Sequence, residues 1–304
     1  MAKAKSEIIA GKYTVPLTNQ QKIYWPEEGF TKGDVINYYD KMAEYILPYL
    51  KGRPLSLKRN PNGISDAGFY HKDAGENAPA FVDVFAVRSG SNGKMIDYIV
   101  CNNKATLIYV ANLGCIEMNP WNSTTKSPGK PTWMVIDIDP ADGNTFEEVV
   151  DVAFATKMIL DKAKLPAYCK TSGSSGLHIY LPMKNKYDYD TVKDFAHIVA
   201  SLVQEQLPKT TTLERSLKKR GNRIYIDYLQ NRTGQTLASV YSIRPVKGAS
   251  VSAPLEWKEV NHKLSPKQFT IKNILQRVKK KGDLFTPVLT ESLSIEKALK
   301  VLGG

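Results

Sequence analysis

Two aspartates, separated by a single residue, stand at the end of a strongly apolar segment. Asp137 and Asp139 close the stretch Trp133–Pro140, whose other residues before the final proline are Trp, Met, Val and Ile. Side chains of a β-strand alternate between its two faces, so both carboxylates would project from the same face. Neighbouring carboxylates repel each other unless a cation lies between them, and oxygen ligands favour Mg²⁺ or Mn²⁺. This segment therefore predicts a metal site, with two solvated acids at a strand end as the alternative.

A third carboxylate occurs in a second strand-like segment far along the chain. Asp227 lies on the polar face of segment 223–229, opposite Ile224 and Ile226. With the first two acids it would give enough oxygen ligands for two metal ions, which can align an attacking oxygen and stabilise a leaving pyrophosphate. The alternative is a surface aspartate paired with a nearby arginine.

A loop of small residues, 171–176, separates two further strand-like segments and is followed by His178. Its two glycines and four hydroxyl residues could aim backbone N–H groups at phosphate oxygens, with the imidazole as a further donor. The Gly-Lys-Ser/Thr ending of a Walker loop is missing. Arg220 and Arg244 could bind terminal phosphates in a bidentate manner. The alternatives are a plain hairpin turn, a core histidine and ordinary arginine–carboxylate ion pairs.

The chain is strongly basic, with a formal net charge of +12. A protein this basic commonly binds a polyanion, and nucleic acid is the leading candidate. Basic and aromatic residues are interspersed in the first third of the chain, at Lys22, Lys32, Lys58, Arg59, Phe69, Tyr70, His71 and Lys72. The adjacent aromatic residues could stack on a nucleic-acid base, although core packing is the usual role of such a pair.

Composition also argues against several classes of protein. The sequence contains no run of about 18 or more apolar residues, the length needed to span a membrane. Residues 1–6 lack the apolar core of a signal peptide. The three cysteines show no CxxC spacing, and their odd number argues against a disulfide framework. We therefore expect a protein of the reducing cytoplasm, and binding to nucleic acid would associate it with the nucleoid.

Hydrophobic periodicity predicts a mixture of helices and strands. Helices are expected at 31–50, 145–164, 190–207 and 294–302, with another opening at 265. Strands are expected at 54–59, 95–100, 105–110, 133–139, 167–170, 177–181 and 223–229, the second and third of them paired as a hairpin. This mixture indicates an α+β fold rather than a doubly wound parallel sheet. We expect one domain over residues 1–304, with a flexible N-terminal extension at 1–14.

Several motifs, taken in order along the chain, resemble one protein family. They are Val135–Pro140, Lys170–Pro182, Asp227–Thr236 and Tyr241–Pro245, supported by segments 17–19, 31–34, 52–59 and 251–257. Together they resemble the polymerase domain of bacterial and archaeal DNA ligase D, a branch of the archaeo-eukaryotic primase superfamily that acts in non-homologous end joining. The resemblance covers about residues 15–260. It implies a primase-polymerase-type catalytic core in which mixed and antiparallel sheets are flanked by helices.

The resemblance also implies roles for individual residues. The ligands of two catalytic metal ions, Mn²⁺ or Mg²⁺, would be Asp137, Asp139 and Asp227. The incoming NTP or dNTP would be bound by Lys58, Ser172, Gly173, His178, Arg220, Gln230 and Arg244. The DNA would be contacted by Asn19, Lys22, Lys32, Arg59, Phe69, Tyr70 and Lys72. In this last group the lysines at 22 and 32 would bind the 5′-phosphate of a broken end, and the aromatic pair would stack at the template.

The chain departs from the family pattern at two positions. Asn119 stands where the family usually has a histidine close to the metal and the primer end, so a contact to the metal is in question. An amide can still donate and accept hydrogen bonds. Ser175 stands where many members have a lysine in the small-residue loop, which removes one contact to the triphosphate.

The function that the resemblance implies is a DNA-directed nucleotidyltransferase. It would add nucleotides, preferentially ribonucleotides, to 3′ ends in gaps and at breaks that carry a 5′-phosphate, during non-homologous end joining. No ligase or nuclease segment is present, so we expect a stand-alone polymerase that works with Ku and a separate DNA ligase, and a dimer across a DNA break is a further expectation. The alternatives are a primase that starts chains de novo and a catalytically weak protein that bridges DNA ends.

Overall fold

The computed structural model describes residues 6–89 and 93–303. The chain folds into two compact units. The first unit contains the chain up to Lys126, Thr236–Val251 and Thr270–Lys279, and the second unit contains Ser127–Gln235, Ser252–Phe269 and the chain from Lys280 onward. Each unit is therefore assembled from three separate stretches of the sequence.

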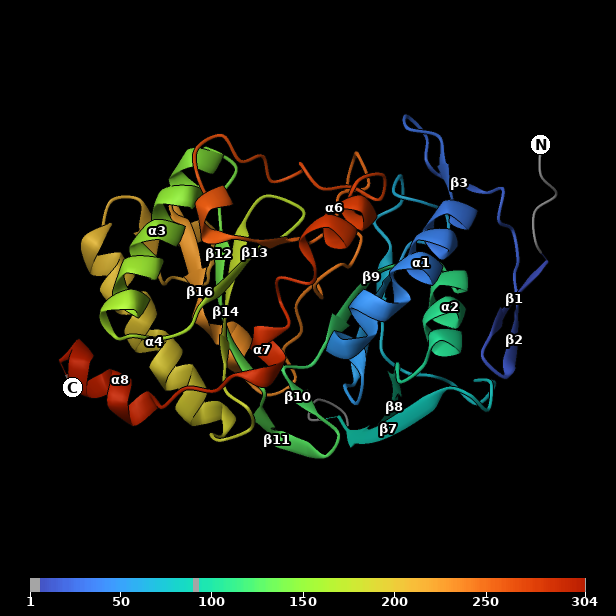
Figure 1. Cartoon of the computed structure of the whole chain (residues 1–304), viewed down its shortest axis with the longest axis horizontal. Helices are drawn as coiled ribbons and strands as arrows, with labels where there is room; N and C mark the ends of the chain where they lie inside the picture. The colour runs from blue at the N-terminus through green and yellow to red at the C-terminus, as the bar shows by residue number, and fades with distance from the viewer. Residues whose placement is uncertain (1–5, 90–92, 304) are drawn as a thin grey trace. The chain divides into compact units, whose positions relative to one another are not determined.

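The second unit is built on a six-stranded sheet (Figure 1). Its strands follow in the order β15 (Thr211–Thr212), β16 (Ile224–Asp227), β12 (Trp133–Asp139), β14 (Leu177–Pro182), β13 (Tyr168–Thr171) and β17 (Pro254–Leu255). All pairings are antiparallel except that between β15 and β16. Residues 133–136 of β12 are buried. The continuous apolar run at the start of this strand reflects its position inside the sheet.

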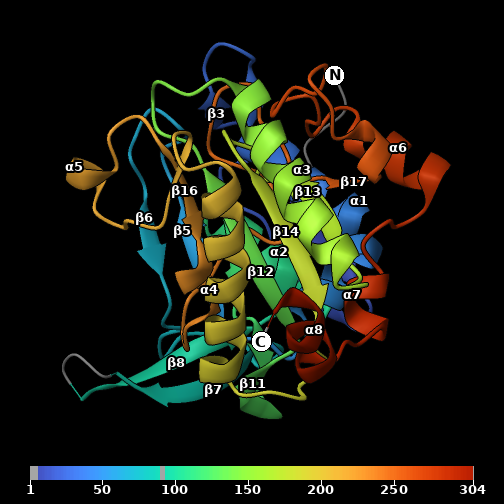
Figure 2. The same ribbon diagram turned by 90° about the vertical axis from the view of Figure 1, so that its left-hand side faces the viewer.

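Two long helices, α3 (Phe146–Lys162) and α4 (Tyr189–Gln206), pack against each other and against β12. Figure 2 shows them side by side in front of the strands. Thr145 begins α3 in a capping box with Glu148, and the Asp188 side chain caps α4. Shorter elements of the unit are β11 (Ser127–Pro131), α5 (Leu217–Arg220), the 3₁₀ helices η1 (Tyr228–Asn231) and η2 (Trp257–Glu259), α7 (Pro287–Thr290) and α8 (Ile295–Leu302).

The first unit contains a three-stranded antiparallel sheet with β5 (Leu55–Arg59) between β6 (Phe69–His71) and β9 (Cys115–Pro120). Antiparallel two-stranded pairs are formed by β1 (Glu7–Ala10) with β2 (Tyr13–Pro16), β3 (Ile23–Trp25) with β4 (Phe30–Thr31), and β7 (Asp83–Arg88) with β8 (Met95–Val100). The short strand β10 (Ser123–Thr124) also belongs to this unit, and α6 (Ile274–Lys281) begins in it.

The long helix of the first unit is α1 (Lys32–Leu50), which packs against α2 (Lys104–Asn112). Thr31 and Asp34 form the expected capping box, since each side chain accepts a hydrogen bond from the backbone N–H of the other. The buried side chains of α1 recur at helical spacing and include Val35, Ile36, Tyr39, Met42 and Ile46. The predicted helix over 31–50 is therefore confirmed.

Two expected elements are wrong. Residues 105–110 form part of helix α2, not a strand, and β8 pairs with β7 instead. Six of the nine residues of α2 are buried. The segment therefore lacks the regular alternation of apolar and polar residues that distinguishes a helix from a strand in a sequence. The helix expected from residue 265 begins at Ile274, because Ser265 and Pro266 start a single turn closed by the Gln268 N–H. A Ser-Pro pair suits such a turn as well as a helix start.

The remaining expected elements are confirmed within a few residues, and the α+β fold class is confirmed. The extension expected at 1–14 lies partly outside the described residues, and its described part contains the hairpin of β1 and β2. A single domain over the whole chain stays a prediction. Cys101, Cys115 and Cys169 are buried free thiols. Among the described residues, no helix combines the length and apolar character needed to cross a bilayer.

Candidate active site

The register of the central strands brings two of the three candidate acids together. Asp137 of β12 is the direct partner of Asp227 of β16, and Asp139 is the partner of Tyr225. Directly opposed residues of an antiparallel pair have Cβ atoms about 4.5–5.5 Å apart and share a face of the sheet. Strand pairing therefore sets these two carboxyl groups side by side, although 90 positions separate Asp137 from Asp227 (227 − 137).

Asp227 is held by three hydrogen bonds. Its carboxylate accepts from the Tyr225 hydroxyl at 3.0 Å, from the Leu229 N–H at 2.8 Å and from the Gln230 amide at 3.1 Å. Burial raises the pKa of Asp227 above its usual value, while the hydrogen bonds from Tyr225 and Leu229 act in the opposite direction. The ionised form of this carboxyl would therefore be stabilised by a cation.

Asp139 faces an arginine. Its Oδ2 lies 3.0 Å from Nη1 of Arg220, whose guanidinium lies over the Tyr225 ring at 4.0 Å. Arg220 is nearly enclosed and also donates to the backbone oxygens of Glu214 and Arg215, whereas the Asp139 side chain is about half exposed. The arginine is the fixed member of this pair, and the aspartate is the member with room to move.

Throughout residues 6–89 and 93–303, no group of three or more His, Cys, Asp or Glu side chains lies in an arrangement that could hold a metal ion. The oxygen donors of Asp137 and Asp227 nevertheless suit Mg²⁺ or Mn²⁺ in chemistry. For Asp139 to join them, its carboxylate would have to leave Arg220. The chemistry of these carboxylates therefore suits a divalent cation, whereas Asp139 is paired with Arg220 in this structure.

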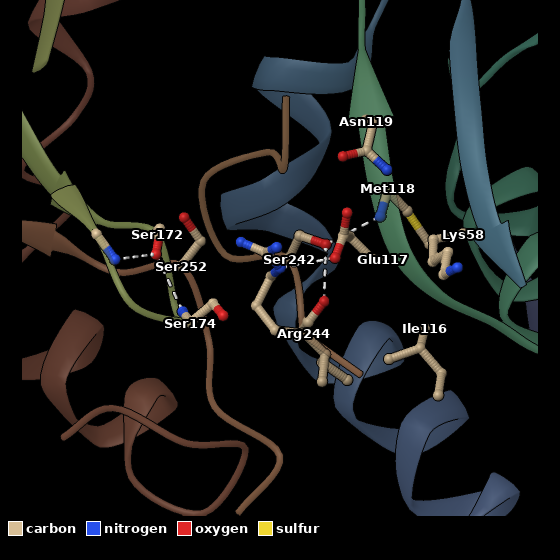
Figure 3. A network of polar contacts seen from close by, with 12 residues as sticks. Lys58, Ile116, Glu117, Met118, Asn119, Ser172, Ser174, Ser242, Arg244 and Ser252 are labelled. Carbon is tan, nitrogen blue, oxygen red and sulfur yellow. Dashed lines mark hydrogen bonds and ion pairs between the residues drawn. The ribbon is translucent and has the colours of Figure 1, made fainter. Parts of the chain in front are cut away.

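The small-residue loop between β13 and β14 is organised by Ser172, whose Oγ accepts from the N–H groups of Ser174 and Gly176, both at 3.0 Å (Figure 3). Gly173 has a φ of 75°, in the left-handed region. A Cβ at Gly176 would lie 2.1 Å from the Ile138 carbonyl oxygen. The loop therefore depends on glycine, and two of its N–H groups are engaged by a side chain of the loop itself.

His178 lies between an acid and a buried lysine. Its Nε2 is 3.4 Å from Oδ1 of Asp137, and its Nδ1 is 2.7 Å from Nζ of Lys170. Lys170 has no exposed surface and is also 2.6 Å from Oγ of Ser252. The sequence singled out the histidine and missed the lysine. The available signal was a charged residue at the end of the strand predicted at 167–170.

The first unit carries a second group of candidate residues, which Figure 3 shows on β5, β9 and the segment around Arg244. Arg244 Nε lies 2.6 Å from Oε2 of Glu117, a buried acid of β9 that the sequence analysis missed. Lys58 of β5 donates to the Ala67 carbonyl oxygen at 2.6 Å. Asn119, at the histidine position of the family pattern, is buried and donates to the Ser56 carbonyl oxygen at 3.2 Å.

Lys22 and Lys32 lie close enough in the first unit to repel each other. Burial is the main cause that lowers the pKa of Lys32, and the charges of Lys22 and Arg59 lower it further. Lys32 donates to Thr18 Oγ1 at 3.0 Å. Asn19 has a φ of 51°, and its carbonyl oxygen closes a turn onto the Lys22 N–H. Such a group of cations would be stabilised by an anion.

The adjacent aromatic residues are exposed, so the alternative of core packing is wrong. Phe69 and Tyr70 are 47% and 61% exposed on β6, an edge strand of its sheet. Lys58 lies over the Tyr70 ring at 5.0 Å, and Arg59 lies over the Phe69 ring at 5.3 Å. Lys72 next to them is exposed as well. Exposed rings flanked by cations are typical of surfaces that bind nucleic acid.

The candidate residues divide between the two units. The second unit carries Asp137, Asp139, Ser172, Gly173, His178, Arg220, Asp227 and Gln230. The first unit carries Asn19, Lys22, Lys32, Lys58, Arg59, Phe69, Tyr70, Lys72, Asn119 and Arg244. The acids and the small-residue loop therefore share one unit, and the cations and aromatic residues assigned to DNA share the other.

Comparisons with known proteins identify a family to which this chain is similar. A family model described as LigD, primase-polymerase domain, matches residues 31–285. The bifunctional non-homologous end joining protein LigD of Bacillus subtilis (strain 168) is 34% identical over 266 residues, which are 87% of this chain and 42% of that protein. The multifunctional non-homologous end joining protein LigD of Mycolicibacterium smegmatis is 29% identical over 279 residues, 90% of this chain and 36% of that protein.

A solved structure is similar as well. The polymerase domain from Mycobacterium tuberculosis Ligase D in complex with DNA matches with a TM-score of 0.84 at 28% identity, over 92% of this chain and 99% of that chain. The chain spans less than half the length of the curated relatives named above, 42% and 36% respectively. The expected primase-polymerase type of fold is thereby confirmed.

Proposed function

Because this chain belongs to the LigD primase-polymerase domain family, a family of nucleotidyltransferases, we propose that it is a repair polymerase of non-homologous end joining. It adds nucleotides to DNA 3′ ends in gaps and at broken ends. The observation that supports this proposal most strongly is the register of β12 and β16, which sets Asp137 opposite Asp227. Two carboxylates at neighbouring positions, one of them with a raised pKa, suit the metal-assisted transfer of a nucleotidyl group.

The acids of the second unit hold the catalytic metal ions in this proposal. Divalent ions bound there, Mg²⁺ or Mn²⁺, supply positive charge that favours loss of the attacking hydroxyl's proton and stabilises the leaving pyrophosphate. Asp137 and Asp227 would hold these ions, and Asp139 would add a third carboxylate if its ion pair with Arg220 were broken. Arg220 would then be able to bind a phosphate oxygen.

In this proposal the nucleotide is bound by cationic and hydrogen-bonding side chains. His178 donates to the triphosphate from Nε2, and Arg244 binds it with the guanidinium that Glu117 orients. Further contacts of the nucleotide come from Lys58, Ser172, Gly173 and Gln230. Asn119 replaces the family histidine with a neutral amide, which can still hydrogen-bond to the primer end.

The broken DNA end is bound by the first unit. Lys22 and Lys32 repel each other in the free protein, and a 5′-phosphate between them would remove this repulsion. Phe69 and Tyr70 stack on template bases, as exposed rings flanked by cations can do. Asn19, Arg59 and Lys72 contribute contacts to the DNA backbone.

The wider role follows the curated relatives, whose names place them in non-homologous end joining. We include in the proposal a preference for ribonucleotides, and cooperation with Ku and with a separate DNA ligase. The chain would act in the cytoplasm at the nucleoid, and two copies would hold the two ends of a break.

The test is extension of a gapped duplex that carries a 5′-phosphate, with NTP or dNTP, in Mg²⁺ and in Mn²⁺. Asp137→Ala and Asp227→Ala should each abolish incorporation while DNA binding persists. Asp190→Ala, at an acid of α4 whose side chain is 90% exposed, is the matched control and should extend normally. Incorporation retained by both active-site variants would refute the proposal, and chain starts on circular single-stranded DNA without a primer would indicate a primase instead.

A further inference from the structure

Lys170 is completely buried in the second unit, although lysine is among the residues least often enclosed in proteins. It lies on β13 directly opposite His178 of β14. Its Nζ is 2.7 Å from His178 Nδ1 and 2.6 Å from Ser252 Oγ, and it lies 5.5 Å from the centre of the Tyr180 ring. A buried ammonium group is costly unless it makes such hydrogen bonds.

Each hydrogen bond around Lys170 can be assigned a donor and an acceptor. Ser252 Oγ lies 2.7 Å from the Thr171 carbonyl oxygen, which can only accept, so the serine hydroxyl donates there. The serine oxygen is then left to accept from Lys170. A protonated lysine has three donors and no acceptor, so a charged Lys170 donates to His178 Nδ1 and this nitrogen accepts.

This hydrogen bond decides which nitrogen of His178 carries the proton. Because Nδ1 accepts, a neutral ring must carry its proton on Nε2. That nitrogen faces Oδ1 of Asp137 at 3.4 Å, and a carboxylate can only accept. The distance is longer than the usual 2.7–3.2 Å of an N–H···O bond. The Nε2–H group is thus directed toward Asp137.

We propose that Lys170 is a positioning residue that holds His178 as the Nε2–H tautomer and directs this N–H at a phosphate oxygen of the bound nucleotide. The inference rests on the proposed function, in which His178 contacts the triphosphate. The lysine itself touches neither the nucleotide nor the metal ions. Its role is to keep the donor of the histidine on the side where the anion binds.

The direct test is the tautomer of His178 in the free protein, measured from long-range ¹H–¹⁵N correlations of the imidazole rings. The chain has only four histidines, and His178→Gln identifies the signals of this one. The wild-type protein should show a protonated Nε2 and an unprotonated Nδ1. Lys170→Met, which keeps an unbranched side chain but removes the donors, should give a mixture of tautomers. A protonated Nδ1 in the wild type, or an unchanged ring in Lys170→Met, would overturn the inference.

Nucleotide kinetics give the second readout. Lys170→Met should raise KM for the nucleotide about tenfold, the equivalent of about 1.4 kcal/mol, with a smaller change in kcat. In the His178→Gln background, where the amide nitrogen takes the place of Nε2 and has no tautomer to fix, Lys170→Met should have little further effect. If Lys170→Met raises KM equally in the wild-type and His178→Gln proteins, Lys170 serves only the stability of the fold. Lys162→Met, at an exposed lysine of α3, is the matched control.

The two readouts separate this inference from the function on which it rests. The tautomer is measured without nucleotide, metal or activity. If the wild-type protein transfers no nucleotides but shows the Nε2–H tautomer that Lys170→Met disturbs, the proposed function fails and the positioning of the ring stands. If the polymerase is active and the tautomer does not depend on Lys170, only the inference fails.

Discussion

Glu117 holds Arg244 by a short ion pair, with 2.6 Å between Oε2 of the acid and Nε of the arginine. The acid lies on β9 and is only 4% exposed. A hydrogen bond to Nε fixes the plane of a guanidinium group, and therefore the direction of its terminal nitrogens. The proposed contact of Arg244 with the triphosphate thus depends on an acid that would not touch the nucleotide.

Replacement of Glu117 should impair nucleotide binding. Glu117→Gln keeps an acceptor for Nε but removes the charge, so we expect a several-fold higher KM for the nucleotide. The loss in the free energy of unfolding should stay below about 1.5–3 kcal/mol, the usual worth of a hydrogen bond to a charged group, because the amide oxygen still accepts from Nε. Steady-state kinetics and urea unfolding measure the two effects. Glu44→Gln, at an exposed acid of α1, should change neither; an unchanged KM in Glu117→Gln would contradict this role.

Divalent cations should stabilise the protein through Asp137 and Asp227. A ligand present at ten times its dissociation constant adds about 1.4 kcal/mol to the free energy of unfolding. Thermal unfolding in Mn²⁺ should therefore occur at higher temperature than in chelator, and Asp137→Ala or Asp227→Ala should remove most of this difference. If the two variants respond to Mn²⁺ as the wild type does, the cation binds elsewhere.

The lysine pair should discriminate between DNA ends. Lys22→Ala combined with Lys32→Ala should lower affinity for gapped DNA with a 5′-phosphate more than affinity for the same duplex without it. The reason is that burial and the charge of Lys22 both disfavour the charged form of Lys32 and lower its pKa, and a bound phosphate would offset both. Fluorescence titration of the two duplexes measures the ratio. Lys41→Ala, at an exposed lysine of α1, should leave the ratio unchanged, and equal losses for both duplexes in the double variant would reassign the pair to general backbone contact.

A methyl group at Gly176 should disturb the small-residue loop. A Cβ there would lie 2.1 Å from the Ile138 carbonyl oxygen, so either the loop or the end of β12 must shift. We expect Gly176→Ala to lose about 1–3 kcal/mol of stability, the usual cost of overpacking, together with most of the activity. At Gly129 nothing lies within 4 Å of an added Cβ, so Gly129→Ala is the control. Normal stability of Gly176→Ala would show that the contact relaxes without cost.

Acidification should destabilise the protein through His71. Burial and the charge of Arg59 lower the pKa of His71 from its usual 6.5, so the unfolded chain takes up a proton more readily than the folded one. The contribution of this group is complete above pH 6.5 and is lost as the pH falls from 6.5 toward the lowered pKa. On acidification, the free energy of unfolding of the wild type should therefore fall more than that of His71→Gln. An NMR titration that places the pKa of His71 at or above 6.5 would contradict this.

The sequence predicted the long elements well because their signals are local. The capping boxes at Thr31 and Thr145 and the apolar spacing of α1 need no tertiary information. Helix α2 was missed because its surroundings bury most of its surface and so remove the periodicity. Whether an apolar run forms a helix or a strand is then decided by packing partners that the local pattern does not contain.

In the candidate site, too, local patterns could be predicted from the sequence and contacts between distant segments could not. The spacing of Asp137 and Asp139 predicted a shared strand face, but the salt bridge between Asp139 and Arg220 depends on where α5 ends, far along the chain. Glu117 and Lys170 were missed because each occurs in a short strand, where a charge has meaning only once its partner is known. Residues expected to touch a ligand are more easily found from sequence than the residues that would orient them.

Each unit is assembled from three separate stretches of the sequence, which affects how the protein behaves when it is cleaved. A protease that cleaves after Lys126 would leave Thr236–Val251 and Thr270–Lys279, both parts of the first unit, covalently attached to the second. The two halves should then stay together under native conditions and separate only in denaturant, so a nicked preparation would run intact on a sizing column. For the same reason, neither unit can be expressed as one uninterrupted piece of the gene.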